Sequence, residues 1–219
     1  MVMAETVFLH LGLHKAASSS FQATCAQNSD LLRTQAICYP PFRHPSCPDR
    51  ILENHSLPLH SLFAERPEQH HINIQCGIAD CTQINDVNMQ ILKDALYGSR
   101  VVLLSAEDVC DLSQKDMRHL RLFLSGRCRR LIPFALVRSP YALHCSALAA
   151  MVVHGGRRMD AARPLLSQRW KIERLMKVFG SAIRWFSFAE ACCASGGACG
   201  IPAVFSGVGS RPILHRSCQ

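Results

Sequence analysis

Short apolar segments alternate with segments of helical periodicity along most of the chain, and this alternation constrains the fold more than any other feature. Residues 7–11 form an apolar run that ends at Gly12, which predicts a buried strand. Residues 82–97 carry apolar side chains at three- and four-residue spacings and stop at Gly98, which predicts an amphipathic helix. The inward face of that helix is expected to carry Ile84, Val87, Ile91 and Ala95, flanked by Leu92 and Leu96.

The same patterns predict further elements. Expected strands cover residues 7–11, 37–39, 101–104, 131–137 and 182–186, with Pro133 placed near the start of its strand. Expected helices cover residues 18–35, 59–64, 82–97, 113–125, 140–153 and 164–179, and residues 40–71 are otherwise expected to be irregular. This order predicts an α/β fold, a three-layer α/β/α sandwich with a mainly parallel sheet. Ligands of such folds bind at the carboxyl ends of the strands.

Size and composition fit one domain with a tail. The chain has 219 residues, of which 48% are apolar, and this content is too high for a disordered chain. Residues 1–194 are predicted to form the α/β domain, whereas the Gly-, Ser- and Cys-rich residues 195–219 show no periodicity and are assigned no element. The net charge of +8 suits an anionic partner but does not choose among a nucleotide, a polysaccharide, a nucleic acid and a membrane.

The cysteines and the amino-terminal segment indicate the compartment. The twelve cysteines have irregular spacings without a Cys-x-x-Cys pair, so we expect free thiols rather than disulfides or a zinc site. Glu5 precedes the first apolar run and no basic residue leads it, which is the reverse of a signal peptide. The longest apolar stretch, 142–153, is shorter than the roughly 20 residues of a membrane span. We therefore expect a cytoplasmic protein.

The turn after the first strand is the first segment that suggests chemistry. Residues 12–20 read G-L-H-K-A-A-S-S-S and lead into a predicted helix, so the turn is P-loop-like. A helix that begins there presents unpaired N–H groups and the positive end of its dipole, which bind anions. A serine-capped helix without a ligand would show the same pattern. A Walker A loop is excluded, because Ala16 follows Lys15 where a magnesium-binding hydroxyl is required.

A second polar pair follows the predicted strand 131–137. Arg138 lies at the end of this strand, at the expected ligand edge, and Ser146 lies about two turns into the next helix. An arginine fork and a hydroxyl so placed could hold a second phosphate. The alternative is a surface arginine and a serine that bonds its own helix backbone.

Taken together, these segments resemble sulfotransferases that use 3′-phosphoadenosine 5′-phosphosulfate (PAPS). The segment VFLHLGLHKAASSSFQ resembles the family's 5′-phosphosulfate loop, and VRSPYALHCS resembles its 3′-phosphate element. VVLLSAEDV resembles the segment between them in carbohydrate-type and bacterial-type members. PLLSQRWKIERLMKVFG, followed by AIRWFSFAEA, resembles a later helix and strand. The resemblance runs over about residues 5 to 192 in the family's order.

The resemblance implies transfer of a sulfuryl group from PAPS to a hydroxyl or amine of an acceptor, expected to be a carbohydrate, without a metal. The residues that would hold the 5′ end of PAPS are Lys15, Ala16, Ala17, Ser18, Ser19 and Ser20. Arg138 and Ser146 would hold the 3′-phosphate. An acceptor hydroxyl needs a base: Glu107, just past strand 101–104, is the first candidate and His14 the second. A carboxylate at a helix start would explain Glu107 equally well.

The sequence departs from the family at two places. Ala17 stands where many members have glycine, so the loop backbone has less freedom to wrap a phosphate. In members of the family, a loop late in the chain closes over the nucleotide. Residues 209–211 are only a weak counterpart of that loop, so we expect a truncated or replaced carboxyl-terminal segment.

These departures keep a catalytically impaired, nucleotide-binding relative open as an alternative. A P-loop kinase is disfavoured by Ala16, although Asp108 could serve it. A nucleic-acid-binding module has the charge but no module signature, so we expect no nucleic-acid partner. A basic surface would accommodate an anionic glycan, although such a set of arginines is more often an ordinary solvated face. Its members are Arg118, Arg121, Arg127, Arg129, Arg130, Arg157 and Arg158.

Overall fold

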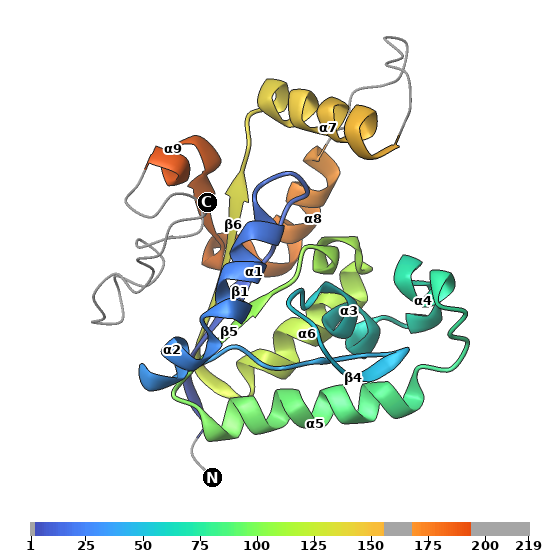
Figure 1. Ribbon diagram of the computed structural model, residues 1–219. Coiled ribbons are helices and arrows are strands. Elements are labelled where there is room, and N and C mark those ends of the chain that lie inside the picture. The colour runs from blue at the N-terminus through green and yellow to red at the C-terminus, as the bar shows by residue number, and fades with distance from the viewer. Residues whose placement is uncertain (1–2, 156–167, 194–219) are drawn as a thin grey trace.

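The computed structural model describes residues 3–155 and 168–193 (Figure 1). Within these residues, a five-stranded sheet with the order β2-β5-β1-β6-β7 forms the centre. All its neighbouring strands pair in parallel, which confirms the predicted α/β class. The strands are β1 (Ala4–His10), β2 (Ile37–Cys38), β5 (Val101–Ser105), β6 (Cys128–Val137) and β7 (Arg184–Ser187). The predicted tail, residues 195–219, lies outside the described residues.

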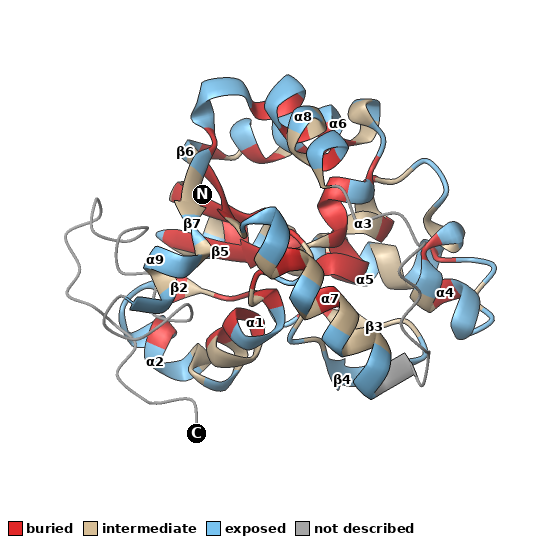
Figure 2. Cartoon of the chain, turned by 90° about the horizontal axis from the view of Figure 1, so that it is seen from above, coloured by how far each residue is buried: buried red, intermediate tan, exposed pale blue. Residues whose placement is uncertain are grey.

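Helices cover both faces of the sheet, and its buried strands lie between them (Figure 2). The helices are α1 (Ser18–Gln27), α2 (Ser29–Thr34), α3 (Ser56–Phe63), α4 (His71–Gln75), α5 (Thr82–Gly98), α6 (Gln114–Ser125), α7 (Pro140–Gly155), α8 (Arg169–Phe179) and α9 (Phe188–Cys193). The core has two parts. Phe8 packs with α1 on one face, and Val7 and Leu9 pack with α3, α5, α6 and α8 on the other. Among the described helices, none has the length and apolar character that a membrane crossing requires.

Pro133 lies in the middle of β6 rather than near its start, because the strand begins three residues earlier than predicted, at Cys128. Proline is rare in central strands because it has no N–H to donate. Pro133 pairs with Leu9 of β1, but β7 joins β6 only from Phe134 onward. At Pro133 the strand is therefore still an edge strand on the β7 side, and the missing N–H leaves no partner unpaired there.

The predicted helix 18–35 is two helices, α1 and α2, divided at Asn28. The Asn28 side-chain amide donates to the carbonyl of Thr24 at 2.8 Å, and its backbone has φ −103° and ψ 19°. Asparagine competes in this way for the backbone groups that a helix needs. The helical periodicity of the segment did not predict this break.

The segment predicted to be irregular, residues 40–71, contains an antiparallel hairpin and two short helical elements. The hairpin pairs β3 (Arg43–His44) with β4 (Cys47–Ile51), and η1 (Pro67–Gln69) follows α3. The hairpin also explains why the inward face of α5 differs from the predicted one. Asn88 is buried and Val87 is 43% exposed, because the Asn88 amide bonds both the N–H and the carbonyl of Arg43.

Candidate functional site

The predicted phosphate-binding turn lies at the carboxyl edge of the sheet. His10 ends β1 and pairs with Ser105 at the end of β5 and with Phe134 in β6. The chain then turns into α1 beside the tip of β6 (Figure 1). The ends of the three middle strands therefore bring the turn, the segment after β5 and Arg138 to one edge, as the topology of parallel sheets requires.

Gly12 is the point at which the turn comes closest to the segment after β5. A Cβ atom added at Gly12 would lie 2.6 Å from the Ser18 hydroxyl oxygen, 2.8 Å from the Glu107 Cβ and 3.1 Å from the Glu107 Cα. Only glycine permits this approach. Glu107 and Ser18 are thus held against the same residue.

The backbone of the turn is unusual at two non-glycine residues. Lys15 has φ 65° and Ala17 has φ 60°, both in the left-handed region. Ala17 is the N-cap of α1, and its methyl group cannot accept a hydrogen bond from the first N–H groups of the helix. Ala17 adopts a conformation that glycine would adopt without strain. Its Cβ does not prevent the turn from forming.

The predicted 5′ residues differ in exposure. Ala16 and Ser18 are buried, at 2% and 3% exposure, whereas Lys15, Ser19 and Ser20 are exposed. Within the described residues, the Ser18 hydroxyl has no hydrogen-bond partner. Buried polar groups are rarely unpaired. The Ser18 hydroxyl therefore marks a position that suits a further acceptor.

Arg138 connects β6 to the turn. Its Nη1 donates to the Lys15 carbonyl oxygen at 3.0 Å, and its guanidinium carbon lies 4.6 Å from the centre of the Phe188 ring. Its Nε is buried without a hydrogen-bond partner among the described residues. An unpaired guanidinium nitrogen, the Ser18 hydroxyl and the start of α1 together fit an anionic group such as a phosphate or phosphosulfate.

Ser146 lies on α7, in the second turn of the helix that follows β6. Its side chain is partly buried, and among the described residues it has no hydrogen bond to residues 12–20. The two predicted 3′-phosphate residues therefore differ: Arg138 contacts the turn directly, and Ser146 lies two helical turns farther along the chain.

The two candidate bases contact each other. The Nδ1 atom of His14 lies 3.5 Å from Glu107 Oε2, and its Nε2 atom lies 3.7 Å from Asp111 Oδ2. The contact with Asp111, followed by that with Glu107, raises the pKa of His14 to about 9. His14 is therefore an imidazolium at neutral pH and has no free ring nitrogen to accept a proton. Asp111, which the sequence analysis missed, has no motif that would have identified it.

Ser56 at the start of α3 holds the segment after β5. Its hydroxyl oxygen accepts hydrogen bonds from the N–H groups of Glu107 at 2.8 Å and Asp108 at 3.3 Å. The Asp108 carboxylate in turn lies 3.0 Å from Nε2 of the buried His70. The position of Glu107 thus depends on Ser56, which lies in the segment 40–71 that was predicted to be mostly irregular.

The fold is similar to that of a solved structure, a sulfotransferase from Alicyclobacillus acidocaldarius. The TM-score is 0.54 with 15% sequence identity, and the match covers 100% of this chain and 87% of that one. This chain has a sulfotransferase-like fold. No protein-family model matches the sequence, and no curated protein matches it. These comparisons describe the fold, and the reaction that the protein could catalyse depends on the side chains of the site.

Two groups of side chains in this sulfotransferase-like fold have the composition of metal ligands. They are His70, His71 and Asp108, and His14, Asp108 and Asp111. Every member except His71 already has a polar contact with another residue. His70 contacts Asp108 through Nε2 and accepts the Ile72 N–H at Nδ1, and the Lys171 ammonium lies 2.7 Å from Asp111. We assign no metal to either group.

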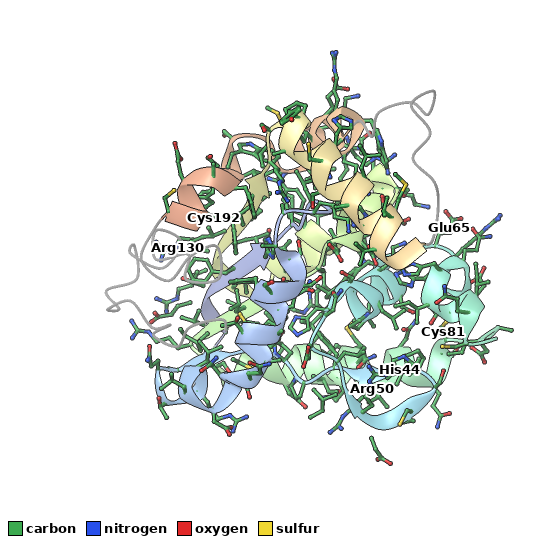
Figure 3. The ribbon with its side chains drawn as sticks, turned by 45° about the horizontal axis from the view of Figure 1, so that its top comes forward. His44, Arg50, Glu65, Cys81, Arg130 and Cys192 are labelled. Carbon is green, nitrogen blue, oxygen red and sulfur yellow. The ribbon has the colours of Figure 1, made fainter. Side chains whose placement is uncertain are left out.

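The arginines of the predicted basic surface lie on several elements. Arg129 and Arg130 lie at the start of β6, at the edge of the sheet opposite to Arg138. Arg127 and Arg121 donate to the carbonyl groups of Phe123 and Val178. Residues 157 and 158 lie outside the described residues. Figure 3 shows the hairpin with His44 and Arg50 and helix α9 with Cys192 on opposite sides of the molecule.

Proposed function

We propose that this protein transfers a sulfuryl group from PAPS to a hydroxyl or amine of an acceptor. The observation that carries the proposal is the contact of Arg138 with the Lys15 carbonyl. The same turn holds the Ser18 hydroxyl, which has no hydrogen-bond partner in the described part of the chain. The Arg138 contact places a guanidinium next to the start of α1 within a sulfotransferase-like fold. Each of these groups favours an anion such as the phosphosulfate or a phosphate of the donor.

The donor would be held by residues of the turn and of β6. Lys15, the N–H groups at the start of α1 and the Ser18 hydroxyl would hold the 5′-phosphosulfate, and Arg138 and Ser146 the 3′-phosphate. When bound, PAPS supplies the sulfuryl group, and its transfer leaves adenosine 3′,5′-bisphosphate. The Lys15 ammonium and the positive end of α1 would stabilise the negative charge that grows on the leaving oxygen.

Glu107 is the proposed general base. It would accept the proton of the acceptor hydroxyl or amine at its carboxylate, which is 19% exposed and lies at the ligand edge. His14, as the imidazolium, would orient this carboxylate and add positive charge near the transferred group. Carbohydrates are the proposed acceptor class, and an acceptor screen would start with neutral and amino sugars.

Thermal stabilisation by adenosine 3′,5′-bisphosphate tests the donor site. We expect the bisphosphate, at about 100 times its Kd, to stabilise the protein by roughly 2.7 kcal/mol. AMP should stabilise it less because it has no 3′-phosphate, and Arg138→Ala should remove the selectivity. Arg118→Ala, an exposed arginine on α6, is the matched control. Stabilisation by ATP with magnesium instead would favour a kinase and overturn the proposal.

The transfer itself is tested with radiolabelled PAPS and the acceptor panel. Sulfated product from the wild type, and none from Glu107→Gln, is the expected result. Tight bisphosphate binding with no product from any acceptor would favour the catalytically impaired relative. In that case the donor site stands and the transferase activity does not.

A further inference from the structure

The first turn of α8 reaches the phosphate-binding turn from more than 150 residues away in the sequence. Gln168, directly before α8, donates a side-chain hydrogen bond to the His14 backbone carbonyl at 2.8 Å. Three residues later, Lys171 lies near the same place with a side chain that is only 9% exposed. Neither residue has a role in the donor site proposed above.

Burial of the Lys171 ammonium requires a partner, because an unpaired ammonium in the protein interior is strongly unfavourable. Its Nζ atom lies 2.7 Å from Asp111 Oδ1. The other carboxylate oxygen, Oδ2, lies 3.7 Å from the ring of His14. Asp111 therefore lies between the lysine of α8 and the histidine of the turn. Together with Gln168, these contacts hold both the backbone and the side chain of His14.

We propose that Gln168, Lys171 and Asp111 form a clamp that holds the phosphate-binding turn in its anion-accepting conformation. The effect of this clamp on anion affinity rests on the function proposed above, whereas its effect on the turn does not. The three are positioning residues, since their contacts reach the turn through His14.

The turn needs such a clamp because its own backbone is strained. Lys15 follows His14 directly and has φ 65°, and Ala17 has φ 60°. Left-handed conformations of non-glycine residues persist when surrounding contacts determine them. Arg138 holds the Lys15 carbonyl from one side, and the clamp holds His14 from the other. A turn fixed before binding loses less conformational entropy when the anion arrives.

Hydrogen exchange and bisphosphate affinity test the clamp separately. We expect Lys171→Met, which keeps the apolar stem but removes the charge, to accelerate amide exchange at residues 13–18 in the ligand-free protein. We also expect it to weaken binding of adenosine 3′,5′-bisphosphate about tenfold. Gln168→Ala leaves the ion pair with Asp111 intact and should give a smaller change of the same kind. Lys177→Met, an exposed lysine of the same helix, should change neither.

A double-mutant cycle shows whether Lys171 acts through Asp111. If it does, Lys171→Met combined with Asp111→Asn should bind the bisphosphate no more weakly than Asp111→Asn alone. Lys171→Met alone leaves the Asp111 carboxylate without its lysine partner and could fold poorly for that reason. The double variant removes this carboxylate as well, so it still tests the clamp. Additive losses in the cycle would overturn the route through Asp111.

The clamp is also overturned if Lys171→Met lowers the melting temperature but leaves exchange at residues 13–18 unchanged, since the ion pair would then only anchor α8. If the wild-type protein binds no bisphosphate, the proposed function fails, and the exchange measurement alone decides the clamp. If the wild type binds it and Lys171→Met and Gln168→Ala bind it equally well, the clamp fails and the proposed function stands.

Discussion

The guanidinium of Arg138 donates a hydrogen bond to the backbone carbonyl of Lys15, from the end of one strand to the turn after its neighbour. This bond joins residues 123 positions apart in the sequence. The Nε atom of Arg138 is buried and has no hydrogen-bond partner within residues 3–155 and 168–193. The same side chain thus supports the turn and keeps one guanidinium nitrogen unpaired among the described residues.

Arg138→Lys should separate charge from geometry at this position. Lysine keeps the positive charge but cannot donate to the Lys15 carbonyl and to an anion from one planar fork. We expect adenosine 3′,5′-bisphosphate to bind about tenfold more weakly, by isothermal titration calorimetry. Arg118→Lys on the exposed face of α6 is the control. Equal affinity of Arg138→Lys and the wild type would show that charge alone suffices.

Gly12→Ala should disturb the site because the new methyl group would lie 2.8 Å from the Cβ and 3.1 Å from the Cα of Glu107. We expect a loss of about 1–3 kcal/mol in the free energy of unfolding, measured with denaturant, together with weaker bisphosphate binding. Gly98→Ala is the control, since a Cβ atom there meets nothing within 4 Å. A Gly12→Ala protein as stable as the wild type would contradict the close approach.

Ala17→Gly should stabilise the protein. At φ 60° alanine is strained, whereas glycine adopts this conformation freely. The gain is partly offset by the greater freedom of glycine in the unfolded chain, so we expect a net increase of about 0.5 kcal/mol in the free energy of unfolding. Bisphosphate affinity should be retained or increased. A lower melting temperature would mean that Ala17 is not in the left-handed region.

The stability of the protein should fall between about pH 6.5 and pH 9 through His14. Its pKa is raised in the folded state to about 9, so its contribution is full below the unfolded value of about 6.5 and is lost as the pH rises through 9. Because the side chain is 45% exposed, solvent screening keeps this contribution to about 1 kcal/mol or less. Denaturant titrations of the wild type and His14→Gln measure it, and the variant should lack this part of the decline.

The buried residues of α5 show what hydrophobic periodicity can and cannot predict about a helix. Leu92, Ala95 and Leu96 are buried as predicted, because apolar spacing reports which face of a helix meets the core. The same spacing placed Val87 inward, but Asn88 is buried there because its amide satisfies the backbone of Arg43. That requirement comes from a hairpin 45 residues away, which no local pattern of α5 contains.

Some residues of the candidate site could be predicted from the sequence, and others could not. The glycine turn, Glu107 after β5 and Arg138 after β6 could be predicted, since each directly follows an apolar strand and parallel strands bring their carboxyl ends together. Asp111, Ser56 and Lys171 could not be predicted. Each is an ordinary polar residue in the sequence, and its role follows from a partner more than 50 residues away.

The sequence by itself therefore determined the strands of the central sheet, the main helices between them, the parallel α/β class and the residue types at the ligand edge, because these depend on spacings within a few residues. Tertiary structure decided which of those residues meet. It placed Pro133 within β6 at a point where β7 has not yet joined, and it paired His14 with Asp111 as well as Glu107. These contacts depend on how distant segments pack, and packing is a property of the whole chain.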